Sequence, residues 1–179
     1  MCKLCETNPV YEFTNKRKLC KTCFLHYFQK KVLYTIRKFK MINRGDAVEY
    51  KKNNSFKGVV LEEILKFIAD KMEISLNSWK KGKIASDSSI DSEADNIVKT
   101  LINGNVSELK KFLPVFGNRI KPLYLFLDEE ILLYAELKNL KFKKSKAKKD
   151  KIKSFEDEFE KKHPEVKRAI VNSILELYE

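Results

Sequence analysis

Four cysteines give the sequence its clearest chemistry, and all of them lie within the first 23 residues. They form two CxxC pairs with fourteen residues between the pairs. Each pair places two thiolates at one turn, and two such turns together supply four soft ligands in tetrahedral geometry. The pattern therefore predicts a structural Zn²⁺ site, and its ligands are Cys2, Cys5, Cys20 and Cys23.

Other interpretations of the cysteines stay open at this point. Two disulfides require an oxidising compartment, and the amino terminus lacks the apolar region of a signal peptide. A redox CxxC usually opens a helix in a larger α/β unit. An iron–sulfur cluster also accepts four thiolates, but the paired spacing favours zinc. His26 is an alternative to Cys23 as a ligand, but because four cysteines are present a place on a helix face accounts for it better.

A hairpin and a long helix must position these cysteines. Residues 10–19 have the pattern of a hairpin with a basic tip, and apolar residues at three- and four-residue steps predict a helix from about Phe24 to Met41. The exposed positions of both elements are strongly basic, which is typical either of a solubilising surface or of a platform for phosphates. The candidate phosphate contacts are Lys16, Arg17, Lys18, Lys30, Lys31, Arg37 and Lys38.

The charge of the whole chain has the same bias. Lys and Arg number 37 against 25 Asp and Glu, a formal net charge of +12, and residues 1–58 hold 14 of these bases against four acids. A second basic stretch, residues 138–153, contains nine lysines and one acid. A polyanionic partner is therefore plausible. Further candidate contacts in this stretch are Lys143, Lys144, Lys146, Lys148 and Lys149.

The remaining chain reads mainly as helices. Helices are expected at about 59–76, 89–102, 107–113, 128–137, 151–161 and 164–177, and short strands near 47–50, 84–85 and 120–125. The fold class that follows is mainly α, with two or three short strands. No apolar run reaches the ~18 residues that span a bilayer, so we expect no membrane segment and a cytoplasmic protein. Only two histidines are present, and no serine-nucleophile motif accompanies them.

Several segments, in order, resemble the PP-loop tRNA 2-thiolation enzymes, which are ATP-dependent sulfurtransferases that form 2-thiouridine. The CxxC pairs, the basic helix and the run RGDAVEY are similar to the family's amino-terminal zinc finger, first helix and first strand. KIASDSSIDSEAD, RIKPLYLFLDEEILLYAELKNLKF and FEDEFEKKHPEVKRAIVNSILELYE resemble later family segments. The resemblance implies a zinc ribbon at 1–25, a linking helix at 26–44 and a truncated, mainly helical PP-loop-like domain at 45–179.

The departures from the family pattern bear on activity. The family strand leads into a Ser-Gly-Gly-Lys-Asp-Ser loop whose backbone holds the ATP phosphates, but here residues 51–56 read KKNNSF, so no ATP site is recognised. Both catalytic cysteines of the family are missing, one of them from the stretch after Phe142, where Lys143, Lys144 and Ser145 stand. A third family motif, Gly-His-Asn-x-Asp-Asp-Glu-Ala, is only partly retained in the segment KIASDSSIDSEAD, as Asp91, Glu93 and Ala94. We expect the two acids to stabilise the start of their helix.

The resulting expectation is a non-catalytic, zinc-containing protein that binds tRNA or another structured RNA. The alternative is a protein-interaction or regulatory subunit, either as a homodimer or on a full-length thiolation enzyme that supplies the ATP site. Independent catalysis is the least favoured of these functions, since the sequence offers neither the phosphate loop nor a catalytic thiolate.

Overall fold

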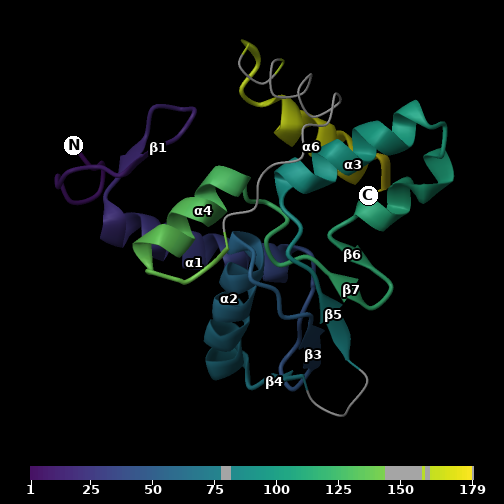
Figure 1. Cartoon of the computed structure of the whole chain (residues 1–179), viewed down its shortest axis with the longest axis horizontal. Coiled ribbons are helices and arrows are strands. Elements are labelled where there is room, and N and C mark those ends of the chain that lie inside the picture. Colours follow the sequence, from purple (N-terminus) through teal and green to yellow (C-terminus); the bar gives the residue numbers. More distant parts are fainter. Residues whose placement is uncertain (78–81, 144–158, 160–161, 179) are drawn as a thin grey trace.

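A five-stranded sheet in the order β4-β3-β5-β7-β6 organises the larger part of the chain (Figure 1). The computed structural model describes residues 1–77, 82–143, 159 and 162–178. β3 pairs in parallel with β4 and β5, β5 pairs in parallel with β7, and the edge strand β6 runs antiparallel to β7. The strands are β3 (Ala47–Tyr50), β4 (Ser75–Leu76), β5 (Lys83–Ala85), β6 (Val115–Phe116) and β7 (Arg119–Ile120).

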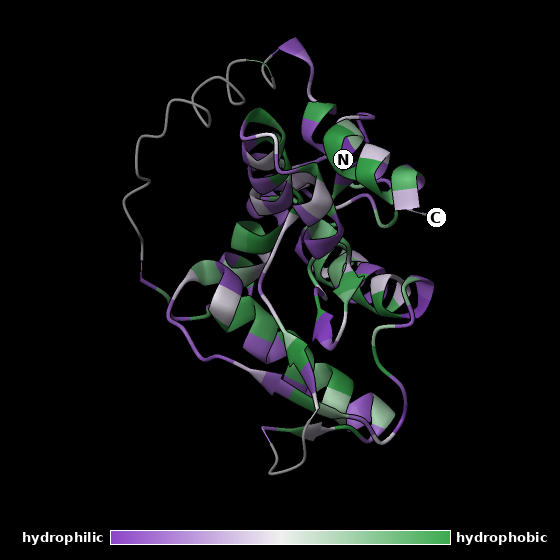
Figure 2. Cartoon of the chain, turned by 90° about the vertical axis from the view of Figure 1, so that its right-hand side faces the viewer, coloured by the Kyte–Doolittle hydropathy of each residue, from purple (hydrophilic) through white to green (hydrophobic). Residues whose placement is uncertain are grey.

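More residues lie in helices than in strands, which confirms the predicted fold class. They are α2 (Phe56–Met72), α3 (Ile90–Ile102), the 3₁₀ helix η1 (Val106–Phe112), α4 (Asp128–Leu137) and α6 (Val166–Tyr178). Figure 2 shows polar and apolar stretches alternating along these ribbons, as amphipathic helices require. Within the described part of the chain, no helix is long and apolar enough to cross a membrane.

Some predicted boundaries were wrong for identifiable reasons. α2 ends at Met72 rather than continuing to residue 76, because Glu73 adopts a left-handed conformation (φ 54°) and the chain then enters β4. The prediction of two or three strands was too low, because β4 and β6 have two residues each and so carry no periodicity. Of the strand expected near 120–125 only Ile120 belongs to β7, and the chain turns at residues 122–125. The predicted helix at 151–161 lies outside the described residues apart from residue 159.

The amino-terminal module consists of a short hairpin followed by α1. β1 (Tyr11–Glu12) pairs antiparallel with β2 (Lys18–Leu19), as predicted. α1 (Lys21–Lys38) begins and ends three residues before its predicted bounds. Its apolar side packs against α4, where the ring of Phe28 lies 4.1 Å from that of Tyr134 and 4.2 Å from that of Phe126, centroid to centroid. The module is thus attached to the sheet-containing part through an aromatic core.

Tyr124 is a polar residue within that core, and it provides a test of the packing. Its side chain is fully buried, and its hydroxyl has no hydrogen-bond partner among the described residues. Replacing it with phenylalanine removes an unsatisfied polar group, so we expect Tyr124→Phe to raise the free energy of unfolding by about 1 kcal/mol. Urea denaturation at neutral pH measures this change.

The same substitution should also change the alkaline stability. Burial, reinforced by the Glu93 charge, raises the pKa of Tyr124 well above its usual value. A tyrosine whose pKa is higher in the folded state than in the unfolded state, where it is about 10, stabilises the fold at pH values below about 10. This contribution is lost as the pH rises above about 10, because the tyrosine of the unfolded state then ionises. The fall in stability above about pH 10 should therefore be shallower in Tyr124→Phe. Tyr34→Phe, at an exposed tyrosine, is the control, and equal slopes in all three proteins would contradict the prediction.

Candidate metal centre and nucleic-acid interface

The four cysteines meet at the junction of the amino-terminal turn, the hairpin and α1. Cys2 and Cys5 lie in a turn closed by the hydrogen bond from the Cys2 N–H to the Thr7 carbonyl, 2.8 Å. Cys20 is the N-cap of α1 and Cys23 lies in its first turn. All four sulfur atoms lie within 4.8 Å of one another. The predicted cysteine set is therefore brought together at one point, in a geometry capable of holding a metal ion.

The spacing of the sulfurs fits one ion rather than disulfides. The Sγ of Cys5 lies 3.4 Å from that of Cys20 and 3.6 Å from that of Cys23, much longer than the ~2.05 Å of a disulfide bond. Four thiolates at about 2.3 Å from a tetrahedral ion lie about 3.8 Å apart, close to these separations. Since Cys23 belongs to the set, His26 is not needed as a ligand, and its side chain lines a neighbouring groove instead.

The thiols influence one another strongly at this distance. Hydrogen bonding from Thr7, and then from the Cys23 backbone, lowers the pKa of Cys20 to about 6. Contact with the Cys5 and Cys20 sulfurs raises the pKa of Cys23 to about 12. Four thiolates this close repel one another unless a cation lies between them, which binds and deprotonates all of them together. The chemistry of the centre is thus that of a cation site.

The predicted basic residues have several different surroundings. Lys16 lies at the hairpin turn with a positive φ of 64°, and its side chain is 86% exposed although its ammonium approaches Glu12 to 3.9 Å. Lys18 is paired with Glu12 at 3.1 Å. The Arg17 guanidinium lies over the rings of Phe13 and Tyr27, at 4.4 and 5.2 Å. The tip of the hairpin therefore presents Lys16 to the solvent, whereas its neighbours are held in place.

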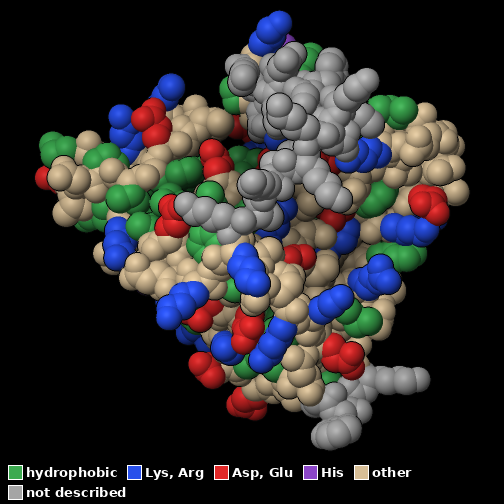
Figure 3. All heavy atoms as spheres, in the orientation of Figure 1, with side chains coloured by type: hydrophobic (Ala, Val, Ile, Leu, Met, Phe, Trp, Pro, Cys, Tyr) green, Lys and Arg blue, Asp and Glu red, His purple; other side chains and the backbone are tan. Residues whose placement is uncertain are grey.

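The basic residues of α1 divide into exposed and paired positions. Lys30, Arg37 and Lys38 are exposed, and none of them forms an ion pair within the described ranges. Lys31 instead donates to both carboxylate oxygens of Glu130 at 3.0 Å. We therefore assign Lys31 a structural role. Figure 3 shows basic side chains at the hairpin, next to a gathering of apolar side chains over the amino-terminal module.

Lys143 is the one predicted contact of the late lysine stretch that lies within the described residues. Lys143 is exposed, and its backbone N–H donates to the Asn54 carbonyl at 2.7 Å, which places it beside the loop between β3 and α2. The other predicted contacts of this stretch lie outside the described residues: Lys144, Lys146, Lys148 and Lys149.

Glu130 is a central residue that the sequence pattern did not indicate. Its carboxylate is fully buried, and it accepts from the Tyr27 hydroxyl at 3.2 Å, from Lys31 and from the Leu127 N–H at 2.9 Å. Arg168 of α6 approaches it to 3.6 Å. This carboxylate joins α1, α4 and α6. Acidic residues are common in the first turn of a helix, so the sequence around Glu130 does not distinguish it. Only the tertiary structure shows that it links the three helices.

The segment KKNNSF, which differs in sequence from the family's phosphate loop, leads into α2, and side chains of the chain itself occupy this helix end. The Ser55 hydroxyl accepts from the Gly58 N–H at 3.0 Å, and the Asn53 amide oxygen accepts from the Ser55 N–H at 3.0 Å. A Cβ on Gly58 would lie 1.9 Å from that amide oxygen. The Asn53 amide nitrogen in turn donates to Asp87 at 3.1 Å. The amino end of α2 is thus capped internally and has a carboxylate beside it.

The two acids retained from the family's third motif are also engaged internally. Asp91 accepts from the Asp128 N–H at 2.7 Å and from Lys167 at 2.9 Å. Glu93 is buried and pairs with Lys121 at 2.8 Å. The cap of α3 is Ser89, whose hydroxyl accepts from the Ser92 N–H.

The comparisons of sequence and of fold that find a match both point to tRNA thiolation proteins. No family model matches it. Its structure resembles that of the "U34-tRNA thiolase NcsA from Methanococcus maripaludis with its [4Fe-4S] cluster", with a TM-score of 0.77, 18% identity and coverage of 98% of this chain and 86% of that one. In sequence, 78 residues are 31% identical to "Cytoplasmic tRNA 2-thiolation protein 1" of Eremothecium gossypii.

The sequence match covers 42% of this chain and 21% of the Eremothecium protein. The chain therefore spans about a fifth of the length of that curated relative. The resemblance to the tRNA thiolation family that the sequence segments indicated is confirmed by both comparisons, and the similarity of fold extends over almost all of the chain.

Proposed function

We propose that this chain is a zinc-containing, non-catalytic RNA-binding protein whose ligand is tRNA or another structured RNA. The observation that carries the proposal is the composition and placement of α1. This helix contains no acidic residue, it exposes Lys30, Arg37 and Lys38, and the metal centre fixes it to the basic hairpin. Lysine and arginine on one surface bind phosphates and release counterions, and structured RNA is recognised mainly through its shape and backbone.

Zinc is the metal that the centre favours on geometric grounds. A single tetrahedral ion requires sulfurs about 3.8 Å apart, and here two pairs are 3.4 and 3.6 Å apart while all four sulfurs lie within 4.8 Å of one another. A [4Fe-4S] cluster, such as the one named for the Methanococcus thiolase, places a separate iron beneath each thiolate and so needs sulfurs farther apart. The bound ion would hold the hairpin against α1. It would act as a structural element of the RNA-binding surface.

The proposal that the chain is not catalytic is based on the positions of its cysteines and on the start of α2. Every cysteine of the sequence belongs to the metal centre, so none is left to carry a persulfide. The internally capped start of α2, with Asp87 beside Asn53, disfavours an ATP phosphate at that position. Both features support a binding function and argue against sulfur transfer.

Charge reversal provides the test of RNA binding. We expect the triple variant Lys16→Glu, Lys30→Glu and Arg37→Glu to lower the affinity for tRNA at least about tenfold. Its binding should also depend less on salt: the slope of log affinity against log salt concentration should become shallower by about 0.7–0.9 for each phosphate that is no longer bound. Filter binding at two salt concentrations measures both quantities. The matched control is Lys52→Glu, Lys66→Glu and Lys71→Glu, which changes the net charge equally at exposed positions around α2. Equal decreases in affinity for the two triple variants would contradict a localised surface.

A protein-interaction role is the second candidate, and a separate surface favours it. Leu101, Ile102 and Val106 are 48%, 65% and 55% exposed near the end of α3 and the start of η1. Apolar side chains gathered in this way are typical of surfaces that a partner covers. A homodimer or a complex with a full-length thiolation enzyme would bury them. Sedimentation of the purified chain distinguishes self-association from a monomer.

A further inference from the structure

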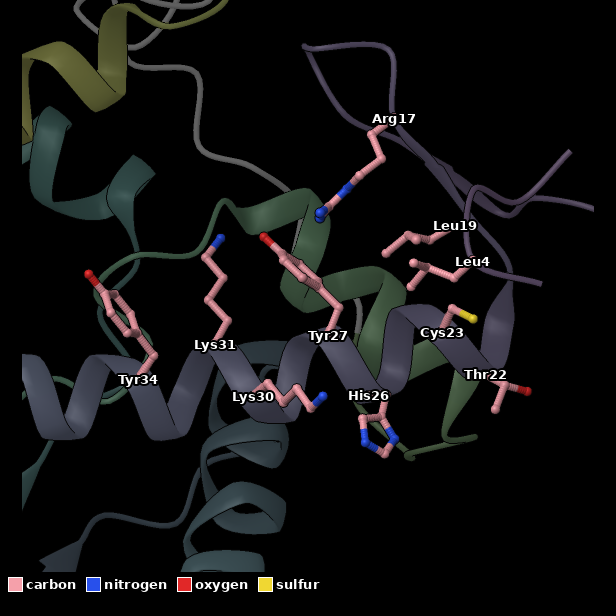
Figure 4. Close-up of a pocket in the computed structure, with 10 residues that line it drawn as sticks. All are labelled: Leu4, Arg17, Leu19, Thr22, Cys23, His26, Tyr27, Lys30, Lys31 and Tyr34. Carbon is pink, nitrogen blue, oxygen red and sulfur yellow. The ribbon is translucent and has the colours of Figure 1, made fainter. Parts of the chain in front are cut away.

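A groove of about 660 Å³ runs along the outward side of α1, next to the metal centre. Its volume is within the range of sites that hold small organic ligands. Figure 4 shows Tyr27, Lys31 and Tyr34 projecting from one side of the helix, with Arg17 pointing down towards them from the hairpin. Lys30 lies on the adjoining side. Thr22 and Tyr34 mark the ends of the helical wall, and at 1.5 Å per residue they are about 18 Å apart.

The charge of the groove favours an anionic ligand. Its lining includes Arg17, Lys30 and Lys31 and contains no aspartate or glutamate. The charge of Lys31 is compensated by Glu130, but the Arg17 guanidinium forms no ion pair within the described part of the chain, and its Nε has no hydrogen-bond partner there. Stacking on Phe13 and Tyr27 nevertheless fixes its position. A planar guanidinium that is positioned in advance and lacks a carboxylate is suited to a phosphate.

The lining of the groove also includes exposed aromatic and apolar side chains. Tyr34 is 48% exposed and Leu4 is 69% exposed, although both are residue types that usually lie inside a protein or at an interface. The ring of Tyr34 can stack on a base of any identity, because every base has a π-face. Binding sites for single-stranded nucleic acid combine two components, phosphate-binding groups and exposed aromatic rings, and this groove contains both.

We propose that this groove binds unpaired nucleotides of an RNA, with a base stacked on Tyr34 and the adjoining phosphates held by Arg17 and Lys30. The inference rests on the proposed RNA-binding function and makes it more specific. The exposed surface of α1 and the hairpin holds the structured body of the RNA through its backbone, whereas the groove selects a loop or end whose bases are free to leave the helix. The protein would thus prefer an RNA in which a duplex adjoins a single strand.

The test compares three RNAs and three proteins. Fluorescence anisotropy measures the binding of tRNA, of a short oligouridylate and of a blunt RNA duplex of the same length to the wild type, to Tyr34→Ala and to Tyr34→Phe. We expect Tyr34→Ala to weaken oligouridylate binding roughly 5-fold to 150-fold and to leave duplex binding within about twofold, because the duplex contacts only the charged surface. Tyr34→Phe keeps the ring and should bind like the wild type.

The outcomes separate this inference from the proposed function. If tRNA binds with steep salt dependence but Tyr34→Ala binds oligouridylate as well as the wild type does, stacking in the groove is wrong and RNA binding stands. If none of the three RNAs binds to the wild type at low salt, both are wrong. If Tyr34→Ala alters sedimentation and leaves RNA affinity unchanged, the groove is a protein contact, which also overturns the proposal. Thermal melting confirms that the variants, changed at an exposed position, remain folded.

Discussion

Cys20→Ser is expected to lose the metal, to unfold the cysteine turn and the hairpin (residues 1–23) and to weaken tRNA binding at least about tenfold. Cys20 is both a member of the four-sulfur centre and the N-cap of α1, so its loss affects the ion and the start of the helix together. Small metal modules have little apolar core, and the binding of the ion provides most of their folding energy. Here the hairpin strands have only two residues each, which is too short to hold without the ion.

Three measurements check this prediction. Elemental analysis of the purified protein should find about one zinc per chain in the wild type and almost none in Cys20→Ser. Amide hydrogen exchange should become fast in residues 1–23, while the amides of α2 and α3 remain protected. The control is Thr14→Ser, an exposed position in the hairpin turn. A coloured protein that contains iron and sulfide would contradict the assignment of zinc.

Glu130→Ala should cause the largest loss of stability outside the metal centre, about 3–5 kcal/mol. The substitution leaves the half-buried Lys31 ammonium without its carboxylate and removes the acceptor of the Tyr27 hydroxyl and the Leu127 N–H. A buried cation without a partner is costly, because the surrounding protein replaces its hydration poorly. Urea denaturation of both proteins measures the difference.

Two further variants make this prediction specific. Glu130→Gln keeps the shape and one acceptor oxygen, so its loss of stability should be smaller than that of the alanine variant. Glu129→Ala removes the neighbouring carboxylate, which is exposed and accepts from Tyr11, and should cost less than about 1 kcal/mol. If both glutamate-to-alanine changes had the same small effect, Glu130 would not be the link between α1, α4 and α6.

The features that the sequence predicted well are those determined by residues close together in the chain. The four cysteines lie within 22 residues of one another, and the turn, the hairpin and the start of α1 bring them together without the rest of the protein. The strand Ala47–Tyr50 was also predicted with its observed bounds. Local periodicity and motif spacing are sufficient for such features.

The features that sequence reasoning missed depend on contacts between distant residues or on very short elements. Tyr27 and Glu130 are 103 positions apart, so nothing in the local pattern of α1 distinguishes the paired Lys31 from the exposed Lys30. The strands β4 and β6 have two residues each and exist because their neighbours provide hydrogen bonds. The groove is likewise a product of tertiary structure, since it needs the hairpin above α1.

The link through Glu130 has a consequence for how the protein is made. The cysteine module is complete once the first two dozen residues have left the ribosome, and domains generally fold as units from the amino terminus during synthesis. The carboxylate that neutralises Lys31 follows 99 residues later, and Arg168 later still. Nascent chains should therefore acquire the metal early and carry α1 with Lys31 unpaired until Glu130 has emerged, and the link to α6 can form only after Arg168 follows.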